Sequence, residues 1–270
     1  MAKLKGVFAR VRLPIFSVKH PETFQVMSCL PIPQPSTLVG ALAYCIGTHH
    51  GSGVKAFYRL KEVIEGNEVK LIARARLMGI TIISPLVLRR FRIADEFHKR
   101  MQFYDILSRG DYYEGKIFLE RALIDAFYRS YAMSHEILCA WIIDEKFEIS
   151  DSIFYLLQRL GDTESLITVC EVWLEDVEIN EAPEIRTSFP FPLGNATIRG
   201  GNFAIMKMCD EKRLVKQFVI PIKHEFRPTD IGKVMIIEPT EVEVVFPYST
   251  TYCETSHGAI ILPEVGGAHG

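Results

Sequence analysis

In LPIPQPSTLVGALAYCIG, residues 30–47, three prolines precede an almost unbroken apolar run. Proline fixes φ and pushes the preceding residue into extended geometry, so the first part is a stiff connector. The apolar run predicts a helix over 36–47, with Ser36 as N-cap and Gly47 as the left-handed residue at its end. The first turn of such a helix presents unpaired N–H groups that attract phosphate. The alternative is a buried helix that only needs a defined entry angle.

The overall composition bounds the class of protein. The chain has 270 residues, 48% of them hydrophobic, which suffices for one large core or two small ones. No apolar run approaches the roughly 20 residues of a membrane span, and the N-terminal segment lacks the apolar core of a signal peptide. The six cysteines never lie within four positions of one another, which argues against a zinc knuckle. We therefore expect a soluble, cytoplasmic protein with buried thiols and with neither metal nor cofactor.

The formal net charge of −2 hides an uneven distribution. Residues 1–47 hold five basic side chains and one acidic one, and residues 69–100 hold eight basic and two acidic ones. Residues 144–184 hold twelve acidic side chains and two basic ones. Such an uneven distribution of charge allows one face to bind phosphates while another repels them. Each charged segment alone could still be an ordinary solvated face.

The periodicity of apolar residues predicts an α+β domain. Alternation with period two in LKGVFARVRL predicts the first strand. In chain order we expect a strand over 4–13, the helix over 36–47, a strand region over 69–88 that breaks near Gly79 and Pro85, a strand over 135–143, a helix over 150–160 capped by Ser150 and ended by Gly161, and a strand over 165–179. This β-α-β-β-α-β order is the ferredoxin-like arrangement, which also underlies the RNA-recognition fold.

Two further segments lie outside that core. Residues 89–133 form an insertion with helical spacing, and residues 183–270 form a smaller β-rich unit of short strands and turns. We therefore expect one domain over 1–182 and a second unit over 183–270. Its last residues, 263–270, are expected to be disordered.

The insertion is dense in arginine, tyrosine and phenylalanine. Aromatic rings can stack on unpaired bases and guanidinium groups can pair with phosphates, which suits single-stranded RNA. Arg89, Arg90 and Arg92 are candidates for that role, and a solvated surface is the alternative. For the larger apolar side chains at helical spacing, a seam between two helices is the better interpretation. These side chains are Phe103, Ile106, Leu107, Ile117, Phe118, Leu123 and Phe127.

The catalytic motifs are weak. GTHHGSGVK, residues 47–55, follows a helix and lacks a Ser or Thr after its lysine, so it predicts a flexible link rather than a phosphate loop. A metal-independent ribonuclease needs a base, an acid and a cation. Residues of these types are present, but their spacing does not predict that they converge. They are His20, Tyr44, His98 and Lys99.

Two motifs resemble those of the CRISPR-associated protein 5 family. HPETFQVMSCLPIPQPSTLVGALAYCIG, residues 20–47, resembles the family's N-terminal signature, a Pro-Glu element followed by prolines, a Ser-Thr pair and an apolar Gly-Ala-Leu helix. LGDTESLITV, residues 160–169, resembles a second stretch at the end of the second helix. The resemblance covers much of residues 4–179 in architecture.

The resemblance implies a non-catalytic RAMP subunit of a type I CRISPR effector (Cascade), with subtype I-A and an archaeal source favoured. Such a subunit caps the complex by binding the 5′ handle of crRNA, and it contacts the backbone RAMP subunit and the large subunit, with target DNA near the complex. Its RNA-recognition-like core carries an inserted thumb and a C-terminal β unit. The residues expected to contact the handle are Lys19, His20, Gln25, Ser36, Thr37, Arg89, Arg90, Arg92 and Arg199.

The family also implies an alternative activity. In type I-C the equivalent subunit cuts the repeat RNA itself with a tyrosine, a lysine and a histidine. Tyr44 lies on the first predicted helix, as that tyrosine does, but no Lys-His pair follows the insertion. The order His98-Lys99 is reversed and earlier, so we do not expect cleavage.

Overall fold

The computed structural model describes residues 4–22, 26–65, 71–92, 97–122, 124–145, 149–162, 165–230 and 232–263. Three predictions fall outside these ranges: the RNA contact Gln25, the seam residue Leu123 and, except for its first residue, the disordered tail over 263–270. No helix of the described part is long and apolar enough to cross a membrane.

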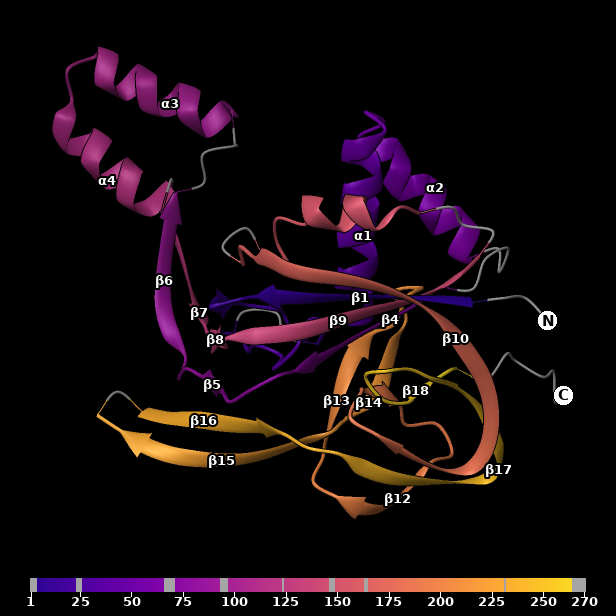
Figure 1. Cartoon of the computed structure of the whole chain (residues 1–270). Coiled ribbons are helices and arrows are strands. Elements are labelled where there is room, and N and C mark those ends of the chain that lie inside the picture. Colours follow the sequence, from indigo (N-terminus) through magenta and orange to yellow (C-terminus); the bar gives the residue numbers. More distant parts are fainter. Residues whose placement is uncertain are drawn as a thin grey trace, which may run out of the picture.

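The largest sheet is antiparallel and runs through the middle of the molecule in the order β12-β17-β10-β1-β9-β4, with β18 beside β17 (Figure 1). The predicted strands over 4–13 and 135–143 are confirmed as β1 and β9. The strands of this sheet are β1 (Leu4–Arg12), β4 (Leu71–Leu77), β9 (Glu136–Asp144), β10 (Thr168–Thr187), β12 (Thr197–Gly201), β17 (Val242–Glu254) and β18 (Ile260–Ile261).

Both faces of this sheet are covered, because its strands alternate apolar side chains between two cores. In β1, Val7, Ala9 and Val11 belong to the larger core, which lies under α1 (Pro35–His49), α2 (Val54–Glu65) and the 3₁₀ helix η1 (Asp151–Leu156). Leu4 and Phe8 belong to a second core on the opposite face, with residues of the C-terminal strands.

The first helix is longer than predicted at both ends. Its N-cap is Gln34 rather than Ser36, because Pro35 occupies the first helical position, where a missing N–H costs nothing. Gly47 lies inside the helix, and Gly51 and Gly53 adopt positive φ instead. A Cβ on Gly47 would lie 2.6 Å from the carbonyl oxygen of Gly53, so glycine is needed there for the tight turn into α2. The segment 47–55, predicted as a flexible link, therefore joins two helices, and α2 was not predicted.

The second predicted helix, over 150–160, is wrong in type and length. Ser150 does cap it, since its hydroxyl accepts a hydrogen bond from the N–H of Ser152, but only the 3₁₀ helix η1 forms. The helix does not continue beyond Leu157, because Arg159 pairs with Leu166 in a β-bridge. The following strand, β10, begins at Thr168, three residues later than predicted, and extends to Thr187.

The insertion is a helical hairpin carried on an arm of two paired strands, and the short strand Val26–Met27 extends this arm by pairing in parallel with the second of them. The predicted breaks near Gly79 and Pro85 separate β4, β5 and β6, and β6 pairs antiparallel with β7. Residues 89–92 and 124–129, predicted as helical, are therefore strands, whereas α3 and α4 between them are helices that lie away from the sheet (Figure 1). The elements are β5 (Thr81–Ile83), β6 (Val87–Arg92), α3 (Phe97–Ser108), α4 (Tyr112–Ala122), β7 (Ile124–Arg129) and β8 (Ala132–Met133).

The predicted seam between the two helices of the insertion is present in its described part. The rings of Phe103 and Phe118 stack with centroids 6.5 Å apart. Gly115 is buried, and a Cβ there would lie 3.0 Å from Leu107 and 3.7 Å from Ile106, so α3 and α4 are in close contact at this point. The side chain of Phe127 lies outside the described ones.

The C-terminal residues are rich in strands, as predicted for residues 183–270. The strand β10 itself crosses residue 182, because its first half pairs with β1 and its second half with β17. The division at 182/183 remains a prediction. The remaining elements are β2 (Ile15–Phe16), β3 (Val26–Met27), β11 (Phe191–Pro192), β13 (Ala204–Cys209), β14 (Val215–Ile220), β15 (Ile222–Thr229) and β16 (Gly232–Pro239).

Candidate nucleic-acid interface

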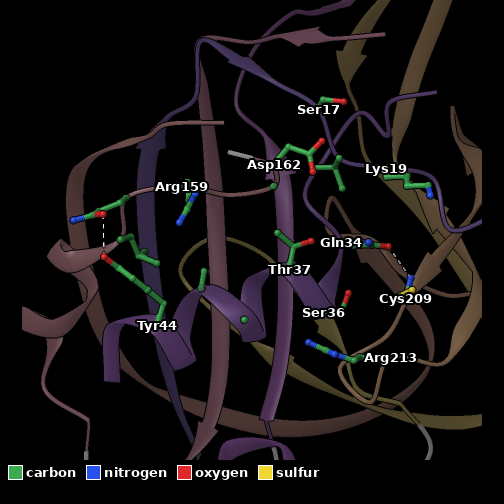
Figure 2. A pocket seen from close by; sticks show the side chains of 16 residues that line it. Ser17, Lys19, Gln34, Ser36, Thr37, Tyr44, Arg159, Asp162, Cys209 and Arg213 are labelled. Carbon is green, nitrogen blue, oxygen red and sulfur yellow. Dashed lines mark hydrogen bonds between the residues drawn. The ribbon is translucent and has the colours of Figure 1, made fainter. Parts of the chain in front are cut away.

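A groove of about 480 Å³ lies beside the N-terminal half of α1 (Figure 2). Four segments that are distant in sequence line it: the chain after β2, the start of α1, the loop after η1 and the turn between β13 and β14. The polar side chains that matter most are Lys19, Ser36, Thr37, Tyr44, Arg159, Asp162 and Arg213. It thereby brings together four of the residues singled out from the sequence, namely Lys19, Ser36, Thr37 and Tyr44.

Gln34 joins the start of α1 to the C-terminal part of the chain. Its backbone carbonyl accepts from the N–H groups of Thr37 (2.9 Å) and Leu38 (3.2 Å), as expected for a residue at the N-cap. Its side-chain oxygen accepts from the N–H of Cys209, at 2.9 Å, instead of capping its own helix. The helix N-terminus and the β13–β14 turn are therefore fixed relative to each other.

The β13–β14 turn presents Arg213 to the groove. The carboxylate of Asp210 is buried and accepts from the N–H groups of Lys212 (2.9 Å) and Leu214 (2.8 Å), which is typical of an Asp-stabilised turn. It also pairs with Lys216 at 2.8 Å. Arg213 has φ of 64°, a left-handed conformation that side chains rarely adopt, so the surrounding contacts hold it there.

A buried ion pair anchors the same turn to the large sheet. The Glu211 carboxylate pairs with Arg74 of β4, whose side chain is only 1% exposed. The same carboxylate accepts from the N–H of Ala73 at 2.9 Å, and the guanidinium carbon lies 5.5 Å from the ring centroid of Phe218. Arg74, counted from the sequence as part of a basic run, is therefore a structural residue.

The charge of the groove is positive. Within the described part of the chain, neither Lys19 nor Arg159 forms an ion pair, and Arg213 adds a third cation. The acidic residue in the described lining is Asp162, whose carboxylate pairs with Arg129 of β7. Burial raises the pKa of the Cys209 thiol above its ordinary value, so this thiol stays neutral and does not oppose an anion.

Tyr44 supplies an aromatic ring at one end of the groove. Its hydroxyl donates to the side-chain oxygen of Gln158 at 2.9 Å, and the residue is 43% exposed. An exposed ring beside cations suits the stacking of an unpaired base next to its phosphate.

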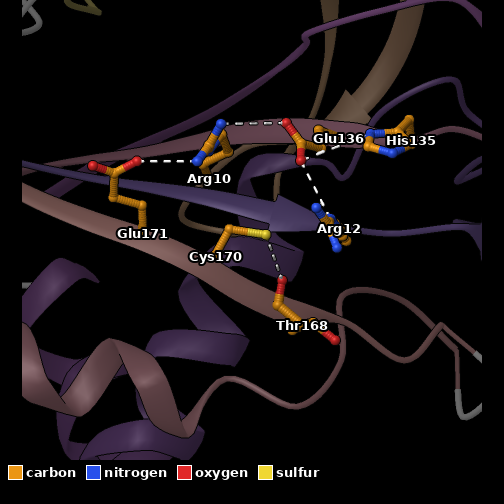
Figure 3. Close-up of polar contacts among 7 residues, drawn as sticks. All are labelled: Arg10, Arg12, His135, Glu136, Thr168, Cys170 and Glu171. Carbon is orange, nitrogen blue, oxygen red and sulfur yellow. Dashed lines mark hydrogen bonds and ion pairs between the residues drawn. The ribbon is translucent and has the colours of Figure 1, made fainter.

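Most of the cations predicted in residues 1–47 do not contribute to a basic surface. Arg10 and Arg12 of β1 lie on the sheet beside acids of the neighbouring strands (Figure 3). Arg10 lies 3.1 Å from the carboxylate of Glu171 and 3.7 Å from that of Glu136, and Arg12 lies 3.4 Å from the latter. We call this cluster, Arg10, Arg12, Glu136 and Glu171, the charge ladder. Lys5 likewise lies 3.9 Å from Glu145.

The other predicted contacts lie elsewhere. His20 accepts at Nδ1 from the N–H of Glu22 at 3.4 Å, next to Lys19 but outside the groove lining. Arg199 lies on β12, at the opposite end of the molecule from α1, and pairs with Glu184 (3.2 Å) and Glu243 (3.8 Å). The backbone of Arg89, Arg90 and Arg92 belongs to β6, while their side chains lie outside the described ones.

The residues considered for a ribonuclease site are not brought together. Tyr44 lies on α1, whereas His98 and Lys99 lie on α3, which Figure 1 places at the far end of the arm. No group of three or more His, Cys, Asp or Glu side chains in the described ranges could hold a metal ion. All six cysteines are free, and three of them, Cys45, Cys139 and Cys253, are buried.

Comparison with solved structures defines the class of fold. A crystal structure of a CRISPR protein from Archaeoglobus fulgidus matches with a TM-score of 0.55, covering 95% of this chain and 98% of that one. At 16% sequence identity this likeness concerns the fold alone. No protein-family profile matches the chain.

Sequence comparison is more specific. The chain is 27% identical over 216 residues to a CRISPR-associated protein Cas5 from Thermoproteus tenax, covering 79% of this chain and 84% of that protein. A Cas5 from Methanocaldococcus jannaschii is 27% identical over 208 residues, covering 73% and 75%. The resemblance to the CRISPR-associated protein 5 family, drawn from the proline-rich motif, is confirmed.

The sequence did not indicate the groove residues contributed by later segments. Arg159 lies in the most acidic stretch of the chain. Arg213 belongs to the mixed-charge segment DEKR, residues 210–213, which is typical of a solvated turn. Gln34 was visible only as part of the proline connector. No periodicity or spacing links these positions to α1, because the link is made by tertiary contacts.

Proposed function

We propose that the protein is a subunit of a type I CRISPR effector, of subtype I-A, that binds the 5′ handle of crRNA in the groove beside α1. The role is one of binding and capping rather than cleavage. The observation that carries the proposal is the set of cations in the groove, Lys19, Arg159 and Arg213. They face the start of a helix, and the one acid in the described lining, Asp162, is already paired.

The groove has the chemistry that single-stranded RNA requires. Phosphates are bound by cations, by hydroxyl groups such as those of Ser36 and Thr37, and by helix N-termini. An exposed ring, Tyr44, can stack on a base. In the charge ladder both arginines already lie beside carboxylates, so the groove is the better candidate.

The arrangement around the groove fits a ferredoxin-like core with an inserted thumb. The order β10-β1-β9-β4, with helices α1 and η1 on one face, supports such a core. The arm of β6 and β7 with α3 and α4 is the proposed thumb, and we infer that it reaches the neighbouring backbone subunit. The large subunit and nearby target DNA are further proposed partners.

Binding of the handle can be tested in the assembled complex. We expect that crRNA with its own handle is retained more strongly than crRNA with a scrambled handle. We also expect affinity to fall as salt rises, because phosphate contacts release counterions. Equal affinity for the two RNAs would contradict handle recognition, and salt-independent binding would contradict phosphate contacts.

The thumb can be tested separately. Replacing residues 97–122 with a short Gly-Ser linker removes α3 and α4 but keeps the paired strands of the arm. We expect this variant to fold and bind handle RNA but to assemble poorly with the backbone subunit. Unchanged assembly would contradict the thumb assignment, and failure to fold would assign the segment to the core.

A further inference from the structure

Asp162 is the acidic side chain among the described residues that line the groove, and Figure 2 shows it opposite the start of α1. A carboxylate at this position opposes the binding of a phosphate, because like charges repel across a partly solvated groove. Its partner, Arg129, lies at the foot of the arm on β7, and the Arg129 side chain is 8% exposed. The cation that compensates Asp162 is therefore buried behind the groove wall.

Both members of this pair are held in place by backbone contacts. The N–H of Asp162 donates to the carbonyl of Ser17 (3.3 Å), and its carbonyl accepts from the N–H of Ser165 (2.9 Å). On the other side, Ser130, next to Arg129, accepts at its hydroxyl from the N–H of Cys29 (2.7 Å). The Ser17 hydroxyl donates to the carbonyl of Ser130 at 3.2 Å and so connects the two sides.

Gly161 keeps Asp162 in this position. It adopts φ of 123°, and a Cβ there would lie 3.0 Å from the Ser165 hydroxyl and 3.1 Å from the Ser17 carbonyl oxygen. The turn that carries Asp162 therefore cannot rotate away without losing several contacts at once. Since the carboxylate cannot leave the wall, its charge has to be compensated where it is.

We propose that Arg129 is a positioning residue for RNA binding: by pairing with Asp162 from behind, it holds that carboxylate against the wall and makes the groove receptive to phosphate. The inference rests on the proposed function, since it concerns the same groove. Arg129 would thus affect RNA binding although it is buried behind the groove and does not itself contact the RNA. The requirement for Arg129 should disappear once Asp162 is neutral.

The test measures binding of a short, fluorescently labelled single-stranded RNA that contains the repeat-derived handle. We expect Arg129→Gln to weaken binding about tenfold. This is the size expected when one carboxylate, Asp162, loses its ion-pair partner at the wall of a partly solvated groove. Arg129→Lys, which keeps the charge, should bind within about threefold of wild type, a loss of well under the 1.4 kcal/mol that corresponds to tenfold. The double variant Arg129→Gln/Asp162→Asn should recover wild-type affinity, and Asp162→Asn alone should bind at least as well as wild type.

Arg12→Gln is a matched control, because Arg12 also pairs with one carboxylate but lies in the charge ladder. It should not change RNA binding.

If Arg129→Gln binds normally, or if Asp162→Asn does not rescue it while thermal melting shows both variants folded, Arg129 has no such role. If Arg129→Gln does not fold, tighter or equal binding by Asp162→Asn still supports the proposal, and weaker binding overturns it. If wild-type protein binds the RNA but Lys19→Gln and Arg213→Gln have no effect, the proposed groove itself fails.

Discussion

The charge ladder and the groove both contain arginines, yet they differ in where the opposing acids come from. In the ladder, Arg10 and Arg12 lie on β1 between β9 and β10, so acids at neighbouring strand positions reach them directly (Figure 3). In the groove, Lys19, Arg159 and Arg213 come from three loops (Figure 2), and the one acid in the described lining pairs with the buried Arg129.

A count of charges along the chain therefore does not locate a binding surface. Side chains opposite each other in an antiparallel sheet form cross-strand pairs, so a basic strand beside an acidic strand neutralises itself. In the groove, by contrast, neither Lys19 nor Arg159 forms an ion pair within the described part of the chain, so both can bind an anionic ligand.

Glu211→Gln should have the largest effect on stability. It leaves the guanidinium of Arg74, 1% exposed, without its carboxylate partner, and breaking a buried pair in this way costs about 3 kcal/mol. The free energy of unfolding, measured with urea, should fall by that amount. Because the β13–β14 turn loses its anchor, RNA affinity should fall as well.

The matched control is Glu225→Gln, which removes the partner of exposed Arg227 on β15. Exposed pairs contribute about 0–1 kcal/mol, so this variant should melt almost as wild type does. Equal losses of stability in the two variants would contradict the anchoring role of Glu211.

Neutralising two cations of the groove, Lys19→Gln with Arg213→Gln, should have the largest effect on binding. If each contacts one phosphate at about 1.4 kcal/mol, affinity for single-stranded RNA falls roughly a hundredfold. The slope of log affinity against log salt should become shallower by about 0.7 for each lost contact. A double variant with an unchanged slope would exclude phosphate contacts at these positions.

Gly161→Ala should destabilise the protein by about 1–2 kcal/mol, because φ of 123° is strained for alanine and the new Cβ crowds Ser17 and Ser165. Asp162 is then displaced, so RNA binding should weaken too. Gly194→Ala is the control: it also has positive φ, but nothing lies within 4 Å of its Cβ position. Only a smaller stability loss, without an effect on binding, is expected there.

Arg10→Gln with Arg12→Gln should have the smallest effect. These side chains are partly exposed and already paired, so we expect RNA affinity within about twofold of wild type and a stability change below about 1 kcal/mol. Competition binding and thermal melting check both values. A large loss of affinity would mean that the ladder, rather than the groove, meets the RNA.

The local pattern was sufficient to predict most of the elements. Period-two alternation predicted β1, the short apolar run over 135–143 predicted β9, and the breaks at Gly79 and Pro85 were predicted where β4 gives way to β5 and β5 to the start of β6. Errors arose where tertiary contacts override local preference. The helix expected over 150–160 ends early because Arg159 and Leu166 form a bridge, and α1 runs past Gly47 because that glycine serves helix packing.

The groove could be predicted only in part, for the same reason. Lys19, Ser36 and Thr37 lie in or beside the proline-rich motif, and their grouping follows from local sequence. Arg213 reaches them through a turn held by Gln34 and Glu211, and such contacts between distant segments leave no pattern in a single sequence.

The most direct test of the account is photo-crosslinking in the assembled complex, with 4-thiouridine placed in the 5′ handle and crosslinked peptides identified by mass spectrometry. The groove account predicts crosslinks to the start of α1, to residues 157–162 and to residues 209–213, with loss of the last set in Arg213→Gln. Crosslinks confined to β1 and β10, where the charge ladder lies, would contradict it.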